Sequence, residues 1–381
     1  MKIAIIGLGY VGRSIAQAAV SAGHSVVGFD TNSDVISSLN LSGDFKGTTE
    51  AGSIGDVEVV VIAVPTPLDG AQKPDLSAVR AACKTIIEHV KNPVLVINES
   101  TSYPGTLRNE IALVIDKASD LGHLYASSPE RVDPGNEKWT QKNTPRLLAG
   151  LTPEATKLAR KFYSSFCDEI IEVSTPEVAE AAKLFENTFR QVNIALVNEF
   201  AQISDTLNIP TREVLDAAAT KPFGFMSFQP GPGVGGHCIP VDPSYLAYVA
   251  EIVGVPAEFI KRANQVNLGM PAYVVSRVAK DVGSLKGKKV VVVGVSYKAN
   301  VSDTREAPAA LVIEELKKLG AEVSWHDSVV ATWNGQTSSE LKGFDIAIVV
   351  TKHDVVSEAA IKASAAYVFD CTGSIKGVAG L

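Results

Sequence analysis

Three glycines near the start of the chain, in Gly7-Leu8-Gly9-Tyr10-Val11-Gly12, constrain the fold more than any other feature. They follow the apolar run Ile3–Ile6 and precede the helical pattern Ser14–Ala22, so they lie where a buried strand turns into a helix. In such a turn the first glycine permits the tight bend, the second lets a pyrophosphate approach the backbone, and the third lets helix and strand pack closely. The sequence therefore predicts a dinucleotide-binding β-α-β unit here.

The strand expected after this turn, Ser25–Phe29, ends at Asp30, about 20 residues beyond the glycines. An acidic side chain at this point accepts hydrogen bonds from the hydroxyl groups of an adenosine ribose and would repel a 2′-phosphate, which favours NAD over NADP. Val64–Pro67 and Glu99–Thr106 follow two further apolar strands, so we expect them at the same edge of a parallel sheet. The predicted cofactor residues in this part are Gly7, Gly9, Tyr10, Val11, Gly12, Asp30, Pro65, Thr66 and Thr101.

The pattern of apolar runs divides the chain into three parts. Residues 1–174 alternate short apolar strands with amphipathic helices, which predicts a parallel sheet covered by helices on both faces. Residues 175–284 show only helical patterns, the longest of them Pro176–Thr206, and residues 285–381 resume the alternation without a full glycine fingerprint. We predict an α/β chain in which a long-helix central domain joins two Rossmann-like parallel-sheet domains. Gly373–Leu381 is expected to be a loose tail.

The expected elements follow from these periodicities. The predicted strands are Ile3–Ile6, Ser25–Phe29, Val57–Ala63, Val94–Ile97, Leu121–Ala126, Lys288–Val293, Glu322–His326, Asp345–Thr351 and Ala366–Phe369. The predicted helices are Ser14–Ala22, Leu76–His89, Thr106–Lys117, Pro176–Thr206, Ile209–Thr220, Pro243–Val253, Ala257–Lys280 and Pro308–Leu319.

Composition excludes several classes of protein. The formal net charge of −7, with no dense Lys/Arg stretch, argues against a nucleic-acid partner. Neither an apolar run of about 18 residues nor a signal peptide is apparent, so we expect no membrane segment and a cytoplasmic location. The four scattered cysteines form neither a disulfide framework nor a metal-ligand pattern, and Cys83 and Cys167 are interpreted as small buried hydrophobic residues.

Cys238 differs from the other cysteines because it lies in Gly233-Val234-Gly235-Gly236-His237-Cys238-Ile239-Pro240-Val241-Asp242. The glycines leave room for a substrate carbon, and a nucleotide cofactor together with an exposed thiol suggests redox chemistry through a covalent sulfur intermediate. On residue type alone the plainer readings are a structural cysteine with an incidental His237, a solvated helix lysine at Lys183 and a surface acid at Glu130.

These motifs together resemble the UDP-glucose/GDP-mannose dehydrogenase family, whose members oxidise C6 of a nucleotide sugar twice. The matching segments span nearly the whole chain in the family's order: Gly7–Gly12, Val64–Pro67, Glu99–Thr106, Ser128–Arg131, Glu180–Asn187, Gly235–Asp242 and Gly294–Arg305. Within the family, Ser128–Asn136 and Gly236–Asp242 are more similar to UDP-N-acetylhexosamine dehydrogenases, acting on a GlcNAc or ManNAc group, than to the UDP-glucose enzymes.

The resemblance implies a role for each matching residue. Cys238 resembles the nucleophile, Lys183 the lysine that stabilises oxyanions at C6, and Asn187 the residue that holds a water or the thiohemiacetal oxygen. Asp242 and Glu130 resemble the acids that activate water, which Thr101 orients. The resemblance further implies that Arg305 contacts the cofactor. It implies that the substrate is bound by Glu130, Arg131, Lys183, Asn187, Gly235 and Lys298. It also implies a homodimer, or a higher homo-oligomer, formed through the central helix.

Three alternatives stay open. The sugar could be glucose, because a hydroxyl in place of an acetamido group at C2 changes few contacts. A two-electron β-hydroxyacid dehydrogenase shares the Rossmann-plus-helix plan and a helix lysine but needs no cysteine. A non-enzymatic nucleotide-binding protein would not need the reactive side chains. The segment Trp333–Ser339 is shorter than in the family and bears on how uridine is bound.

Overall fold

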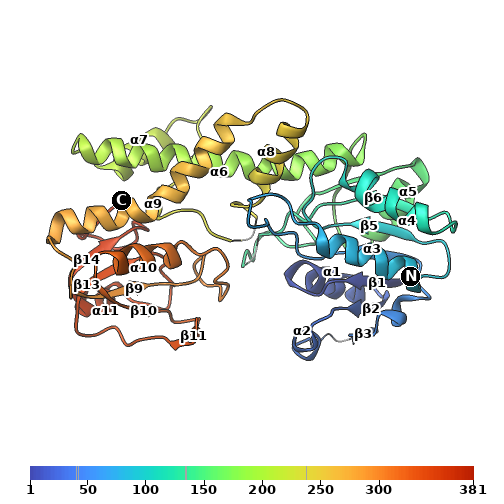
Figure 1. The fold of residues 1–381 in the computed structure, drawn as a ribbon, viewed down its shortest axis with the longest axis horizontal. Coiled ribbons are helices and arrows are strands. Elements are labelled where there is room, and N and C mark those ends of the chain that lie inside the picture. The colour runs from blue at the N-terminus through green and yellow to red at the C-terminus, as the bar shows by residue number, and fades with distance from the viewer. Residues whose placement is uncertain (40, 42, 134, 237) are drawn as a thin grey trace. The chain divides into compact units, whose positions relative to one another are not determined.

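The computed structural model describes residues 1–381 except Asn40, Ser42, Pro134 and His237 (Figure 1). The histidine beside Cys238 therefore lies outside the described residues. The chain divides into two compact units, Met1–Glu186 with Ser244–Pro256 and Asn187–Pro243 with Ala257–Leu381. The division falls inside two helices, and the boundaries of the three domains predicted from the sequence stay a prediction.

The first unit is built on a sheet with the strand order β3-β2-β1-β4-β5-β6-β7-β8. Neighbouring strands run parallel except β6 and β7, which pair antiparallel. The strands are β1 Lys2–Ile6, β2 Ser25–Phe29, β3 Phe45–Thr48, β4 Val59–Ile62, β5 Leu95–Asn98, β6 Leu124–Ser127, β7 Arg146–Gly150 and β8 Ile170–Glu172. From β1 the chain continues to β2 and β3 on one side, and from β4 it continues to β5 and β6 on the other side. Ligands of open parallel sheets bind at this reversal, between β1 and β4.

Helices cover this sheet on both faces, as the alternating pattern predicts. They are α1 Tyr10–Ser21, α2 Ser33–Ser37, α3 Ser77–His89, α4 Leu113–Ala118 and α5 Pro153–Tyr163, with a 3₁₀ turn at Ala51–Ile54 and a π-helical stretch at Leu107–Ala112. Every residue of β4 is buried because both faces of that strand are covered. In the core, Ile15 of α1 and Phe162 of α5 pack with strand residues such as Ile5 and Val61.

The second unit contains a smaller sheet with the order β10-β9-β13-β14-β15, parallel throughout. The elements are β9 Lys289–Val293, α10 Pro308–Lys318, β10 Glu322–His326, β13 Phe344–Val349, α11 Glu358–Ser364, β14 Ala365–Asp370 and β15 Ala379–Gly380. The short pair β11 Thr332–Trp333 and β12 Gln336–Thr337 forms a hairpin, in which Trp333 contacts the buried Trp325 ring edge-on. The predicted second Rossmann-like half is thus confirmed.

One expectation for this half is wrong. Gly373–Leu381 is not a loose tail, because Ala379 and Gly380 pair with the end of β14 and Ile375 is buried. The Ile375 N–H donates to Asp370 Oδ2 at 2.7 Å, which ties the segment to the sheet. A two-residue strand has no periodicity, so the sequence pattern could not predict it.

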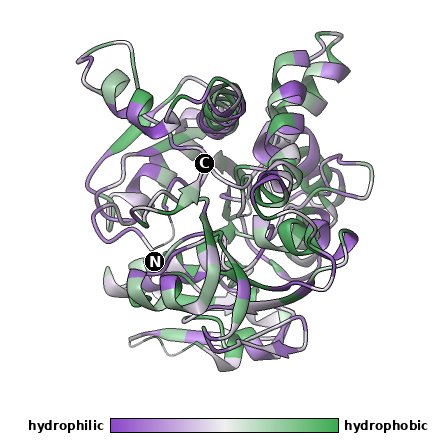
Figure 2. Ribbon diagram, turned by 90° about the vertical axis from the view of Figure 1, so that its left-hand side faces the viewer, coloured by the Kyte–Doolittle hydropathy of each residue, from purple (hydrophilic) through white to green (hydrophobic). Residues whose placement is uncertain are grey.

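Long helices make up the rest: α6 Pro176–Thr206, α7 Thr211–Ala219, α8 Asp242–Ile252 and α9 Glu258–Val282. All four match predicted helices to within a few residues. Helices α6 and α9 pack side by side in the second unit, where Asn198 Nδ2 donates to Asn267 Oδ1 at 2.9 Å (Figure 1). Helices show both hydrophobic and hydrophilic residues along their length (Figure 2). Over the part of the chain that the structure describes, none combines the length and hydrophobicity needed to cross a membrane.

Candidate active site

The three fingerprint glycines are required for two different reasons. Gly7 has φ +90°, and a Cβ there would lie 2.5 Å from the Ala63 carbonyl oxygen; a Cβ on Gly12 would lie 1.9 Å from the Gly7 oxygen. A Cβ on Gly9 would meet no protein atom within 4 Å. The fold itself therefore requires Gly7 and Gly12, whereas the absence of a side chain at Gly9 leaves the backbone accessible from solvent. A dinucleotide pyrophosphate fits there.

Two features beside Gly9 complete the cofactor fit. Helix α1 begins at Tyr10 with no side-chain hydrogen bond capping it, so its first N–H groups suit an anion. Asp30 accepts N–H hydrogen bonds from Leu8 at 2.8 Å and Asn32 at 2.9 Å. One such bond on each carboxylate oxygen leaves acceptor capacity for ribose hydroxyls.

The same turn is built a second time in the smaller sheet. Gly294 has φ +87°, and its N–H donates to the His326 carbonyl at 2.8 Å, as Gly7 donates to Phe29 at 2.8 Å. Val295 N–H donates to Asp327 Oδ2 at 2.9 Å, the counterpart of the Leu8–Asp30 bond.

Asp327 is engaged differently from Asp30. Its carboxylate also accepts from Ser296, Val329 and Val330 and lies 3.0 Å from His353 Nε2. Burial raises the pKa of Asp327, but these donors outweigh burial, and the pKa lies well below its usual value. A carboxylate so engaged has little capacity left for a ribose.

The loops that follow β4 and β5 are tied to each other and to helices. Ser100 Oγ accepts from Val64 N–H at 2.9 Å, which joins the Pro65–Thr66 loop to the loop carrying Thr101. Thr66 is buried, and its carbonyl oxygen accepts from the Tyr245 hydroxyl of α8 at 3.0 Å. The structure therefore places Pro65, Thr66 and Thr101 at the carboxyl edge of the sheet.

Helix α6 holds the Thr101 loop from the other side. The carboxylate of Glu180, fully buried, accepts from Gly105 N–H at 2.7 Å and Leu107 N–H at 2.9 Å. Burial raises the pKa of Glu180 to about 7, although these bonds lower it. Lys183 lies three residues further along the helix, so Glu180 fixes the loop relative to the lysine.

Glu130 and Lys183, predicted as site residues from separate segments, lie close enough to interact. Both side chains are buried, and the Lys183 ammonium acts electrostatically on Glu130. Burial raises the pKa of Glu130, but Arg146, Gln141, the Val132 N–H and Lys183 together bring it below its usual value.

The Glu130 loop also reaches the glycine fingerprint. Burial raises the pKa of Tyr10, and the charges of Glu130 and Asp133 raise it further. The structure therefore brings Tyr10, Glu130 and Lys183 together in the first unit. The Arg131 guanidinium is held by Glu186 at 2.7 Å and the Pro145 carbonyl at 2.7 Å, so it is already engaged within the protein.

The remaining predicted residues are in the second unit, around Cys238. Cys238 is half-buried, whereas Cys83, Cys167 and Cys371 are buried. The Asp242 N–H donates to the Cys238 carbonyl at 2.8 Å, and Asn187 Nδ2 donates to Asp242 Oδ2 at 2.5 Å. The structure therefore brings Asn187 of α6 next to the segment that carries Cys238 and Asp242; their roles in the reaction stay a prediction.

A cationic side chain lies near the thiol. Asp303 binds the Arg305 guanidinium and is the main reason that the pKa of Arg305 is raised. Electrostatic interactions with Tyr297 and Cys238 raise this pKa further. Gly236 N–H donates to the Arg305 carbonyl at 3.2 Å. A backbone hydrogen bond and an electrostatic interaction thus connect the cysteine loop to the segment that carries Arg305.

The glycines before Cys238 have a packing role. A Cβ on Gly235 would lie 2.8 Å from Tyr297 Cβ, and one on Gly236, with φ +84°, would lie 3.0 Å from the Tyr297 ring. Gly235, predicted to bind substrate, is therefore also required by its neighbours. Lys298 follows Tyr297 and is half-buried.

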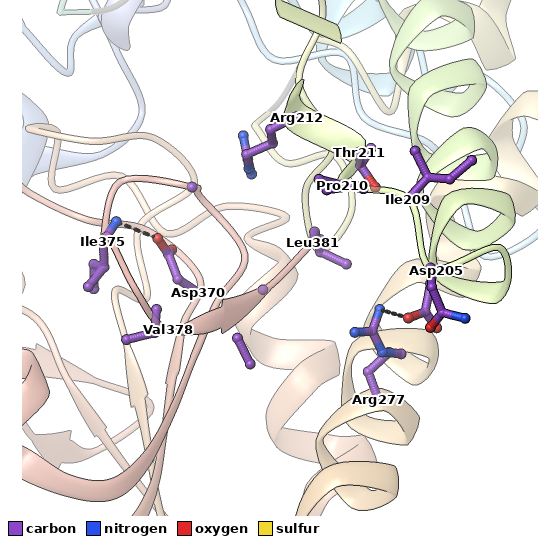
Figure 3. Close-up of a pocket in the computed structure, with 14 residues that line it drawn as sticks. Asp205, Ile209, Pro210, Thr211, Arg212, Arg277, Asp370, Ile375, Val378 and Leu381 are labelled. Carbon is purple, nitrogen blue, oxygen red and sulfur yellow. Dashed lines mark hydrogen bonds and ion pairs between the residues drawn. The ribbon is translucent and has the colours of Figure 1, made fainter. Parts of the chain in front are cut away.

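A separate pocket of about 490 Å³ lies in the second unit between the α6–α7 junction, Arg277 of α9 and the last residues of the chain (Figure 3). Its charged groups already have partners: Arg277 pairs with Asp205 at 2.8 Å, and Arg212 Nη2 donates to the Cys371 carbonyl at 3.0 Å. None of the predicted site residues lines it.

The open dinucleotide turn, the second Rossmann-like sheet and the thiol loop define a dehydrogenase that uses a nicotinamide cofactor. The chain belongs to the UDP-glucose/GDP-mannose dehydrogenase family: it matches the family's NAD binding domain over residues 34–167, its central domain over 177–268 and its UDP binding domain over 291–377. It is thus an NAD-dependent oxidoreductase with a UDP-binding domain.

Individual proteins resemble it over most of their length. "Protein CapL" of Staphylococcus aureus is 37% identical, over 86% of this chain and 82% of its own. A UDP-N-acetyl-D-glucosamine 6-dehydrogenase of Pseudomonas aeruginosa is 35% identical, over 87% and 83%. The solved structure of a UDP-D-ManNAc dehydrogenase from Pyrococcus horikoshii superposes with a TM-score of 0.88 at 30% identity and covers 100% of this chain and 99% of its own.

Proposed function

We propose that the protein oxidises C6 of a UDP-N-acetylhexosamine, with GlcNAc or ManNAc as the sugar, to the uronic acid in a four-electron, NAD-dependent reaction. The observation that carries this is the pairing of two facts: the Pseudomonas aeruginosa and Pyrococcus horikoshii relatives are named as dehydrogenases of these two UDP-sugars, and Cys238 alone among the four cysteines is half-buried and interacts electrostatically with Arg305.

Each oxidation removes a hydride from C6 and a proton from the hydroxyl oxygen on C6, and NAD, when bound, would accept the hydride. Cys238 Sγ would add to the C6 aldehyde and form a thiohemiacetal, which the second oxidation converts to a thioester. Water would then cleave the C–S bond and release the carboxylate and the thiol. One alcohol, two NAD⁺ and one water give one carboxylate, two NADH and three protons.

The protein's charged groups stabilise this sequence. The Lys183 ammonium, buried on α6, would hold the negative oxygen at C6 in both oxidations. Asn187 lies one helical turn further along and would hold the thiohemiacetal oxygen, with Asp242 on its amide. Arg305, whose guanidinium Asp303 also binds, would interact with the Cys238 thiolate when it forms.

The water-activating acid is proposed to be Asp242, with Glu130 assisting. Glu130 already accepts four hydrogen bonds, from Arg131 N–H, Val132 N–H, Gln141 and Arg146. It would have to give up one of these before it could take a proton from water. Thr101 would orient the water, and Arg131 and Lys298 would contact the nucleotide sugar.

The stoichiometry of NADH tests the proposal and separates it from the alternatives. Purified protein is given limiting UDP-GlcNAc, UDP-ManNAc or UDP-glucose with excess NAD, and NADH is measured per mole of sugar. Two NADH and a uronic acid from an N-acetylhexosamine support the proposal. A preference for UDP-glucose would correct the sugar, and one NADH with an active Cys238→Ala variant would replace the reaction by a two-electron oxidation.

We also propose a homodimer formed through α6. Helix α6 and the residue that follows it expose five large apolar side chains spaced by four or seven residues, so they share one face: Phe185, Phe189, Leu196, Ile203 and Leu207. A second copy of the same helix would cover them by isologous packing. Light scattering should give a dimer for the wild type and for Lys157→Glu, an exposed control on α5, and a monomer for Leu196→Glu with Ile203→Glu.

Two further proposals concern organisation and location. The order of the three family matches supports three domains with boundaries at 1–174, 175–284 and 285–381. NAD and a UDP-sugar as reactants, together with the buried thiols of Cys83, Cys167 and Cys371, support a cytoplasmic location. Limited proteolysis would map the boundaries, and cell fractionation would test the location.

A further inference from the structure

A buried arginine in the first unit lies between two buried carboxylates. Arg146, the first residue of β7, is 4% exposed. Its Nη1 lies 2.9 Å from Glu99 Oε2, and its Nη2 lies 3.4 Å from Glu130 Oε2. We propose that Arg146 is a positioning residue of the reaction, which keeps Glu130 ionised and oriented beside Lys183; this rests on the proposed function for what Lys183 does.

The hydrogen bonds of Glu130 show why it must be a carboxylate. Oε1 accepts from the N–H groups of Arg131 at 2.7 Å and Val132 at 2.6 Å, and Oε2 accepts from Gln141 Nε2 at 2.5 Å and from Arg146. All four partners are donors, and only the ionised group accepts four hydrogen bonds without offering one of its own.

Arg146 acts on Glu130 directly and through Gln141. Its Nη2 donates to Gln141 Oε1 at 2.6 Å, which turns the amide so that Nε2 faces Glu130. The guanidinium is held on its other sides by the Ser128 hydroxyl at 3.1 Å and the Tyr163 ring, whose centroid lies 4.4 Å away. A planar fork with several fixed donors makes these contacts; a lysine ammonium could not make all of them.

Glu99 competes with Glu130 for the same positive charge. It follows β5 and accepts hydrogen bonds from Tyr163 and Arg146. Burial raises the pKa of Glu99 to about 7, although Arg146 lowers it. Arg146 therefore faces one anion when Glu99 is protonated and two when it is ionised.

The groups around Glu130 connect this network to the reaction. The charged and titratable groups acting on it or on its partners are Arg146, Lys183, Glu99, Tyr163, Cys167, Tyr10 and Asp133. Of these, Lys183 is the proposed oxyanion stabiliser. An anionic Glu130 favours the protonated form of that buried lysine, so Arg146 supports catalysis without touching the substrate.

Two matched variants should have different effects on the acid limb of the pH profile. Arg146→Lys loses the fork, so the pKa of Glu130 rises and the acid limb of kcat moves to higher pH, by about one unit. Glu99, with a pKa of about 7, is already protonated at the pH of that limb, so Glu99→Gln should leave the limb in place and serves as the matched control. The KM for NAD is expected to stay within about twofold in both variants, because neither side chain belongs to the dinucleotide turn. Gln141→Met removes one donor at small risk to folding and should shift the limb upward in part.

A purely structural role for Arg146 predicts something else. Arg146→Lys would then lower the melting temperature, and both Arg146→Lys and Gln141→Met would leave the acid limb of kcat unchanged; that outcome overturns the proposal. A ¹³C NMR titration of the Glu130 carboxyl, assigned with Glu130→Gln, measures its ionisation without turnover. It should show the same shifts even if the wild-type product contradicts the proposed function.

Discussion

Replacing Gly9 and Gly12 separately by alanine should divide the glycine fingerprint into a ligand position and a fold position. Gly9 has φ −63° and an added Cβ would meet no protein atom within 4 Å, so Gly9→Ala should fold with a stability change within about 1 kcal/mol. The new methyl group would stand where the pyrophosphate approaches. Overpacking of this kind costs about 1–3 kcal/mol, which weakens NAD binding about 5- to 150-fold.

Gly12→Ala should behave the other way. Its Cβ would lie 1.9 Å from the Gly7 oxygen and 3.3 Å from Ile5 Cγ2, so α1 must move away from the strand. The gain in helix propensity, about 1 kcal/mol, is smaller than the cost of displacing backbone in a packed core. A net loss of about 1–3 kcal/mol lowers the melting temperature by about 2–12 °C for a unit of this size.

Thermal melting without ligand and calorimetric titration with NAD measure the two effects independently. Gly23, exposed at a turn with φ +83°, offers a control: Gly23→Asn should change neither NAD affinity nor folding beyond about 1 kcal/mol. Wild-type NAD affinity in Gly9→Ala, or a wild-type melting temperature in Gly12→Ala, would refute the assignment of open space to one glycine and close packing to the other.

Three further outcomes follow from the site. Cys238→Ser should retain NAD and UDP-sugar binding but stall at an enzyme-linked ester or release little acid, whereas Lys183→Ala should slow both oxidations by about 10²–10³ in kcat. Intact-protein mass spectrometry and stopped-flow NADH absorbance distinguish the two outcomes. Wild-type turnover in Cys238→Ser would show that the cysteine is structural. Asp30→Ala should narrow the preference for NAD over NADP in kcat/KM, and an unchanged ratio would contradict the ribose contact. The pKa of Asp327 is lower in the folded protein than its unfolded value of 3.8, so the ionised carboxylate stabilises the fold above about pH 5, and this stabilisation is lost as the pH falls. Asp327→Asn should therefore melt at a lower temperature than the wild type at pH 7. The difference in melting temperature should shrink toward pH 3.

Elements whose burial is uniform could be predicted from the sequence. β4 and β9 are nearly continuous runs of valine and isoleucine because helices cover both faces of each sheet. β7 and β8 could not be predicted in this way. β7 has only three apolar residues, Leu147–Ala149, after the charged Arg146, and two of the three residues of β8 are exposed, so both are shorter than the apolar run of about four residues that the pattern depends on.

The same distinction holds within the site. Gly9 and Cys238 lie in motifs whose local spacing carries the chemistry, and they could be singled out from neighbouring residues alone. Arg146 and Gln141 carry no such signal, because their partners come from other elements: Arg146 is 47 residues from Glu99 and 16 from Glu130. Their role appears only once the sheet places these segments together.

This difference explains what a motif leaves unspecified. A motif determines which functional groups are present, and Glu130 and Lys183 supply the carboxyl and amino groups that the reaction needs. Whether those atoms carry the required charge depends on their surroundings, since burial alone would favour a neutral carboxylic acid at Glu130 and a neutral amine at Lys183. In this chain the opposing charge comes from a residue outside every motif: Arg146 keeps Glu130 ionised, and Glu130 in turn favours the ammonium of Lys183. Two chains with identical motifs could therefore differ in the pH at which they work, and the residue at position 146 is where we expect that difference to originate.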